Sequence, residues 1–205
     1  MCNFFYVDTE NIGSSFLEGK DTLKAGDIMH LYHNDDRELG FSPAYLLEMN
    51  SSAATVNVVH IKAENQKNAV DFHIVTRLVH DIEKYGNRAK YYIVSYDRGY
   101  EAAITAIRSL YEGIEVNLIN TSDTNMVEND IRFYVKHTFY EESKAVRKAF
   151  SRVLIEASKL EGDKKKEWLN YTKNGIRREL YKDHKRLLEV FERNITAITE
   201  IMERE

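Results

Sequence analysis

NFFYVDTEN, residues 3–11, is the stretch that decides the fold, because a short apolar run ends directly in an acid, Asp8. Aromatic and β-branched residues favour strands, so residues 3–7 are predicted to form one. Four more runs of this kind are bounded by polar residues or glycine: 28–33, 55–61, 91–94 and 114–119. The sequence therefore predicts five short strands.

Helical patterns lie between the later strands. Apolar residues recur at steps of three and four within 70–82 and 103–111, as on the buried face of a helix. Ser42 and Pro43 are typical of a helix start, which predicts a short helix over 44–49. Alternating strands and helices indicate an α/β fold with a central, mainly parallel five-stranded sheet flanked by helices.

The remainder of the chain has a purely helical pattern, so we expect two domains, 1–125 and a helical extension, 126–205. Three helices are predicted in the extension: a long one at 126–160, a short one at 163–172 and a C-terminal one at 175–203. The last carries a heptad-like apolar seam, formed by Tyr181, His184, Leu188, Phe191, Ile195, Ile198 and Met202. This seam either packs on the long helix or forms a homodimer. Three heptads are short for a free coiled coil, which favours packing within the chain.

Composition excludes several classes of protein. The 205 residues contain one cysteine, Cys2, which excludes an intramolecular disulfide and a cysteine-rich metal site. No apolar run approaches the ~18 residues of a membrane helix, so we expect a cytoplasmic protein without membrane contact. The net charge is −4, but residues 1–125 carry 11 basic against 18 acidic side chains and residues 126–205 carry 18 against 15. The extension is therefore net basic.

Acids follow the predicted strands. Asp8 ends the first strand and Asp97 follows the fourth, while Asp71 lies near the start of a helix and Asp123 beyond the fifth strand. Ligands of parallel sheets bind at the carboxyl ends of the strands, so these side chains are expected to converge if strands one and four are neighbours. Clustered carboxylates repel each other unless a cation is bound, and oxygen ligands suit Mg²⁺ or Mn²⁺. The pattern predicts a metal site suited to phosphoryl chemistry.

Each acid also has an alternative interpretation. Asp8 is also consistent with a simple helix cap or turn residue, and Asp123 stands in a sequence typical of helix starts. Glu10 is either a further ligand or a solvated residue. His73 is not expected to be a ligand, because hard cations rarely recruit imidazole.

Three segments together resemble the PIN-like nucleases of the NYN-type branch: VDTEN (7–11), KNAVDFHI (67–74) and VSYDRGYEAAI (94–104). The resemblance covers about residues 1–122. It implies a PIN-like Rossmannoid fold and metal-dependent cleavage of RNA. Asp8, Asp71 and Asp97 match the metal-binding acids of that family, while Asn11 and Ser95 match polar residues that border its site.

The sequence departs from the family pattern at two places. Arg98-Gly99-Tyr100 replaces the Asp-Phe pair that follows the third acid in many PIN domains. The fourth acid has no clear match, with Asp123 favoured over Asp130, so the number of metal ions stays open.

Basic residues mixed with aromatics over 164–186 suit single-stranded RNA or an RNA loop, because exposed bases stack on aromatic rings. Lys165, Lys166, Arg177 and Arg178 are the predicted RNA-binding residues. The alternative is an ordinary solvated helix face.

Two other functions remain open. One is a catalytically inactive RNA- or protein-binding module with the same fold. The other is an enzyme with Asp8 as a phosphoryl-accepting nucleophile. The haloacid-dehalogenase-like pattern would need a second aspartate at position 10, where this sequence has Glu10.

Overall fold

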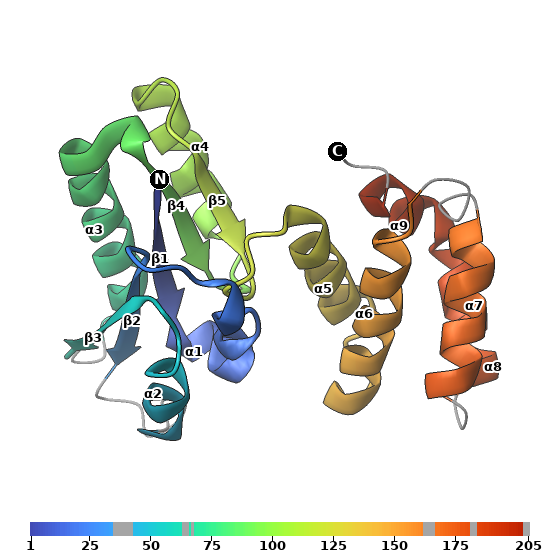
Figure 1. Cartoon of the computed structure of the whole chain (residues 1–205). Coiled ribbons are helices and arrows are strands. Elements are labelled where there is room, and N and C mark those ends of the chain that lie inside the picture. Colours follow the sequence, from blue (N-terminus) through green and yellow to red (C-terminus); the bar gives the residue numbers. More distant parts are fainter. Residues whose placement is uncertain (35–42, 63–65, 67, 162–166, 181–183, 203–205) are drawn as a thin grey trace. The chain divides into compact units, whose positions relative to one another are not determined.

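The computed structural model describes residues 1–34, 43–62, 66, 68–161, 167–180 and 184–202 (Figure 1). The chain divides into two compact units, Met1–Thr124 and Asn125–Glu205. Each unit is described by itself below. No helix among the described residues is both long enough and apolar enough to cross a membrane.

The first unit contains the predicted sheet of five strands, all parallel. The strands are β1 (Cys2–Asp8), β2 (Ile28–Asn34), β3 (Thr55–Ile61), β4 (Ala89–Val94) and β5 (Val116–Ile119). Their order is β3-β2-β1-β4-β5, so the α/β fold expected from the sequence is confirmed. β1 lies between β2 and β4, and the strand order reverses there. This is the place where a parallel sheet binds its ligands.

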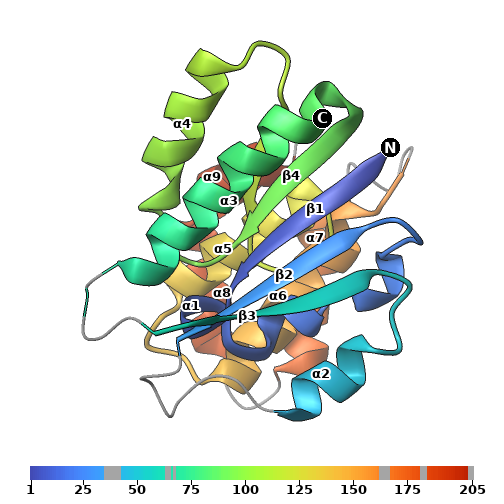
Figure 2. The same cartoon turned by 90° about the vertical axis from the view of Figure 1, so that its left-hand side faces the viewer.

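Alternate residues of β1 point to opposite faces of the sheet. Phe4 and Tyr6 lie in one apolar cluster with α3 (Ala69–Tyr85) and α4 (Tyr100–Leu110) (Figure 2). Phe5 and Val7 lie in another, beneath α1 (Thr9–Ile12), the 3₁₀ helix η1 (Gly13–Leu17) and α2 (Pro43–Met49). Two further 3₁₀ turns are η2 (Lys20–Thr22) and η3 (Gly86–Arg88). Both faces of the sheet are thus covered, which explains why its strands are apolar on both sides.

A polar cluster is buried between α3 and the sheet. The Oδ2 atom of Asp81 accepts hydrogen bonds from the Tyr6 hydroxyl at 3.0 Å and from Arg77 Nε at 2.9 Å. His30 Nε2 lies 4.0 Å from the same oxygen. Burial is the main cause that lowers the pKa of His30, and the charge of Arg77 lowers it further.

The second unit consists of α5 (Met126–Thr138), α6 (Lys144–Ser158), α7 (Trp168–Glu179), α8 (His184–Arg193) and α9 (Ile195–Met202). The prediction of one long helix over 126–160 is wrong, because α5 ends at Thr138 and α6 begins at Lys144. Ser143 caps α6 by accepting a hydrogen bond from Val146 N, and Arg147 Nη1 donates to the carbonyls of Tyr140 and Glu142. These bonds satisfy backbone groups that a continuous helix would have paired.

The predicted helix boundary before Gly175 is also wrong, since α7 runs through this residue. A Cβ at position 175 would lie 2.6 Å from Val153 Cγ1, so the glycine permits close packing of α7 on α6. The predicted C-terminal helix is two helices, because Asn194 separates α8 from α9.

The apolar seam of the C-terminal segment packs within the unit. Phe191 is fully buried, with its ring centroid 6.3 Å from that of Phe150 and 6.2 Å from that of Trp168. Ile198 and Met202 belong to the same cluster. Tyr181, the first residue of the seam, lies outside the described residues. The structure supports intrachain packing of this segment and leaves the homodimer as a prediction.

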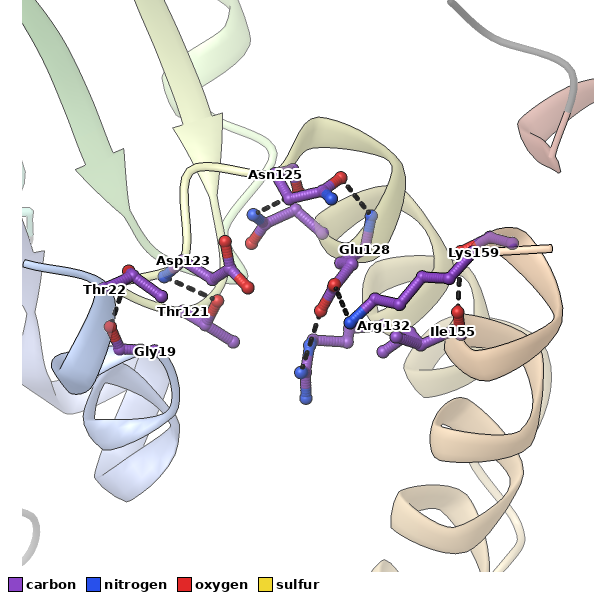
Figure 3. A network of polar contacts seen from close by, with 11 residues as sticks. Gly19, Thr22, Thr121, Asp123, Asn125, Glu128, Arg132, Ile155 and Lys159 are labelled. Atoms are coloured by element: carbon purple, nitrogen blue, oxygen red, sulfur yellow. Dashed lines mark hydrogen bonds and ion pairs between the residues drawn. The ribbon is translucent and has the colours of Figure 1, made fainter. Parts of the chain in front are cut away.

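Polar contacts tie α5 to α6 (Figure 3). The side chain of Asn125 caps α5 by accepting a hydrogen bond from Glu128 N at 3.2 Å. The Glu128 carboxylate pairs with Lys159 at 2.7 Å and with Arg132 at 3.6 Å. Lys159 directly follows α6, so this ion pair joins the start of one helix to the end of the next.

Candidate active site

Asp8 is fully buried at the carboxyl end of β1 and is surrounded by hydrogen-bond donors. Asn11 donates twice, from its backbone N to Asp8 Oδ1 at 3.3 Å and from its side-chain Nδ2 to Asp8 Oδ2 at 2.7 Å. Asp8 is therefore the N-cap of α1, as one interpretation of the sequence expected. Capping α1 orients the carboxylate and leaves its other possible roles open.

Ser95 joins the ends of β1 and β4. Val7 and Val94 are register partners, so Ser95 follows β4 directly beside Asp8. The Ser95 hydroxyl donates to Asp8 Oδ2 at 3.1 Å and accepts the backbone N–H of Asp97 at 3.0 Å. Asp97 Oδ1 in turn accepts the N–H of Gly99 at 2.7 Å. One hydroxyl thus couples the position of Asp8 to the loop that carries Asp97.

The Tyr100 hydroxyl lies between two of the predicted acids. It donates to Asp71 Oδ1 at 2.7 Å and lies 3.3 Å from Asp8 Oδ2. A hydroxyl has one proton, so the shorter contact is the principal bond and the longer one is weak. Sequence reasoning recorded Tyr100 only as a departure from the family pattern. The sequence does show that Tyr100 lies three residues after Asp97, near the start of a predicted helix, and this position could have indicated that it lies close to the acids.

The pKa values of both carboxyl groups are raised. Burial raises the pKa of Asp8, although the hydrogen bonds from Asn11 and Ser95 partly oppose the shift. Burial also raises the pKa of Asp71, and the charges of Asp8 and Asp97 raise it further, while the Tyr100 hydrogen bond lowers it. Each raised pKa means that the protein disfavours negative charge at this edge of the sheet, which a bound cation would relieve.

A pocket of about 340 Å³ opens at this edge of the sheet. Two of the predicted acids, Asp71 and Asp97, line this pocket. The full lining consists of Asn68, Asp71, Phe72, Val75, Asp97, Gly99, Tyr100 and Ala103. Asp97 is exposed, Asp71 is half-buried and Asp8 lies fully buried behind Tyr100. The pocket therefore gives solvent, and any ligand, access to Asp71 and Asp97.

The three predicted acids provide the type of ligand that a hard divalent cation prefers. Asp8, Asp71 and Asp97 supply carboxylate oxygens, and their mutual repulsion favours a cation. Across the described ranges, however, no group of three or more His, Cys, Asp or Glu side chains is arranged so that it could hold a metal ion. The structure brings Asp8 and Asp71 to one hydroxyl and places Asp97 in the same pocket as Asp71.

The other candidate acids are not among the residues that line this pocket. Asp123 follows β5, where its backbone N–H donates to Thr121 Oγ1 at 3.2 Å (Figure 3). A Cβ at Gly19 would lie 2.3 Å from Asp123 N, so η2 approaches this turn closely. Asp130 belongs to α5 in the second unit, and Glu10 to the short helix α1.

The predicted RNA-binding residues are only partly described. Lys165 and Lys166 lie outside the described residues. Arg177 and Arg178 occupy the last turn of α7. Arg177 Nη1 donates to Asn174 Oδ1 at 3.0 Å, and Arg178 pairs with Glu179 at 3.3 Å. These surface contacts are weak enough for a phosphate to replace them.

Comparison with known proteins identifies a family for the first unit. A family model described as PIN domain matches residues 2–119, which include all five strands and the residues around the pocket. No curated protein and no solved structure matches the chain.

Proposed function

Because the chain belongs to the PIN domain family, whose members are typically metal-dependent nucleases, we propose that it is a divalent-metal-dependent ribonuclease. One observation carries this proposal. Asp8 and Asp71 meet at the Tyr100 hydroxyl, and Asp71 shares an open pocket with Asp97, at the carboxyl ends of β1 and β4.

Each residue would have a distinct part in the reaction. A Mg²⁺ or Mn²⁺ ion bound by Asp8, Asp71 and Asp97 would polarise the phosphodiester and lower the pKa of an attacking water. Asn11 and Ser95 hold the Asp8 carboxylate in a fixed orientation. The Gly99 backbone N–H donates to Asp97 Oδ1, which would orient this carboxylate before RNA binds.

The proposed RNA contacts include the basic residues of the second unit. Arg177 and Arg178, with Lys165 and Lys166 from the adjacent segment, are proposed to bind the phosphate backbone of a single strand or loop. Membership of the NYN-type branch, a cytoplasmic location and a homodimer through the C-terminal segment stay predictions from the sequence.

The second candidate is a catalytically inactive binding module for RNA or protein. The observation in its favour is the Tyr100 hydroxyl, which lies between Asp8 and Asp71, donates to Asp71 at 2.7 Å and contacts Asp8 at 3.3 Å. A protein that never binds a cation would need such a donor to keep the buried Asp8 and the half-buried Asp71 close together.

Incubation of the protein with single-stranded and structured RNA in Mg²⁺ or Mn²⁺ separates the two candidates. We expect cleavage that EDTA abolishes and that Asp97→Asn reduces by at least about 100-fold. Asp21→Asn is the matched control, because Asp21 is an exposed acid of the same unit. Cleavage that persists in EDTA or is unchanged in Asp97→Asn refutes the nuclease. RNA binding without divalent ions, together with no metal binding by calorimetry, supports the inactive module.

A further inference from the structure

The pocket beside the acids has an apolar wall for which the cleavage chemistry gives no reason. Phe72 and Val75 belong to α3 and Ala103 to α4, and all three line the pocket together with Asp71 and Asp97. Asp71 and Val75 are four residues apart in α3, so they share one face of that helix. Asp97 and Gly99 come from the segment just before α4, and Ala103 from its first turn. A ligand that fits here is charged at one end and apolar at the other.

Phe72 is unusual in its exposure. Phe72 is 70 % exposed, whereas Ile74 and Leu78 of the same helix are fully buried. A flat aromatic face that remains in water beside a polar site is a common platform for a flat ligand. Phe72 lines the same pocket as Asp71 and Asp97, which places its ring near the expected point of cleavage.

Asn68 adds a polar group to the lining of the same pocket. It precedes α3 with a left-handed backbone, φ 63°, and lines the pocket. An asparagine amide offers both hydrogen-bond donors and an acceptor, as the edge of a nucleobase does. The aromatic face of Phe72, the apolar side chains of Val75 and Ala103, and the amide of Asn68 together complement the surface of a base.

We infer that Phe72, Val75, Ala103 and Asn68 form a nucleobase-binding subsite in which one unpaired base stacks on Phe72 while its phosphate faces Asp71 and Asp97. The inference rests on the proposed function and deepens it, because it names the residues that would bind a base of the single-stranded substrate. A base inside a duplex is covered by its neighbours, so only a single-stranded segment can occupy the subsite.

The test measures binding without cleavage. A fluorescein-labelled oligouridylate and an abasic ribose-phosphate chain of the same length are titrated with the protein in EDTA and again in Ca²⁺, with anisotropy as the readout. Phe72→Ala is expected to weaken binding of the oligouridylate by about 5- to 100-fold and binding of the abasic chain by less than about 2-fold. Phe72→Tyr is expected to restore affinity, because it restores the aromatic face.

Two matched controls each replace an exposed apolar side chain outside the pocket lining by alanine. Leu47 and Leu110 are 74 % and 76 % exposed, so Leu47→Ala and Leu110→Ala also remove an exposed apolar side chain. Neither is expected to change binding of either chain by more than about 2-fold.

The inference is overturned if wild-type protein does not bind the oligouridylate, if Phe72→Ala affects both chains equally, or if it affects neither. A wild-type dimer that Phe72→Ala dissociates would also overturn it, by assigning the exposed ring to a second copy of the chain. These outcomes are independent of the nuclease assay. Base-dependent binding without cleavage refutes only the proposed reaction, and normal cleavage by Phe72→Ala without a base-dependent loss refutes only the subsite.

Discussion

Replacing Tyr100 by phenylalanine would remove one hydroxyl from the centre of the candidate site and leave the buried ring in place. The hydroxyl bonds to Asp71 at 2.7 Å and contacts Asp8 at 3.3 Å. A hydrogen bond to a charged group is worth about 1.5–3 kcal/mol. Asp71 is half-buried, so water replaces part of this bond, and we expect a loss of about 1–2 kcal/mol. In a unit of this size, that corresponds to a melting temperature lower by about 4–8 °C.

The loss should depend on pH. The pKa of Asp71 is already raised by burial, and removing the Tyr100 bond raises it further. A carboxyl group whose folded pKa exceeds its unfolded value stabilises the fold at low pH, and this contribution is lost as pH rises through the folded pKa. Tyr100→Phe should therefore be closer to wild type at pH 4 than at pH 7.5.

Tyr91→Phe is the matched control. Tyr91 lies in the same apolar cluster, but its hydroxyl donates to the neutral carbonyl of Gly86 at 2.8 Å. This variant should lose about 1 kcal/mol at both pH values. Thermal unfolding of the full chain, followed by circular dichroism, measures both variants. A loss below about 0.5 kcal/mol for Tyr100→Phe, or the same loss at both pH values, would refute our description of the site.

The melting temperature of Tyr100→Phe should also respond to divalent metal ions. Without the hydroxyl, Asp8 and Asp71 keep their repulsion but lose a shared donor, so a cation should stabilise the variant more than the wild type. Saturating Mg²⁺ or Mn²⁺ should raise the melting temperature of Tyr100→Phe by more than that of the wild type. An equal or smaller rise would show that the hydroxyl does not compete with a cation there.

Three further predictions concern other parts of the chain. Burial lowers the pKa of His30 below its ordinary 6.5, so the unfolded state binds more protons below that pH and stability falls as pH decreases through 6.5. His30→Phe should flatten the dependence of urea unfolding on pH just below 6.5; an unchanged slope would show that His30 is not its source. Gly175→Ala should destabilise the second unit by about 1–2 kcal/mol in urea unfolding, because the new Cβ would lie 2.6 Å from Val153 Cγ1. Val153 is fully buried, so Val153→Ala is destabilising by itself, but Gly175→Ala should cost less in that background than in the wild type. An equal cost in both backgrounds would show that the clash is not the cause. Arg177→Gln and Arg178→Gln should each reduce the slope of log affinity for RNA against log salt by about 0.7; unchanged slopes would exclude phosphate contacts there.

The sequence alone was enough to predict the sheet and two positions of the site. Runs of aromatic and β-branched residues identify all five strands, because such residues suit a pleated surface covered on both faces. Asp8 and Asp97 follow two of these runs, and the parallel sheet then requires both to lie at the carboxyl edge. Both features can be recognised from residues that are neighbours in the sequence.

The helices of the second unit show where such patterns fail. The sequence predicts one helix through residues 139–143, yet the helix is interrupted there. Ser143 caps α6, and Arg147 donates to the carbonyls that the interruption leaves without helical partners. Gly175 suggests a helix end in the sequence, but its role is to let α7 approach Val153. Both effects depend on partners that periodicity does not identify.

What only the tertiary structure decided is how the acids are held. Tyr100 comes from α4 and Asp71 from α3, and only the packing of both helices on one face of the sheet brings them to Asp8. The same packing places the exposed ring of Phe72 beside the acids. A sequence specifies which side chains follow a strand, because that relation is local. Which hydroxyl lies between two acids depends on contacts between residues far apart in the chain, and those form only on folding.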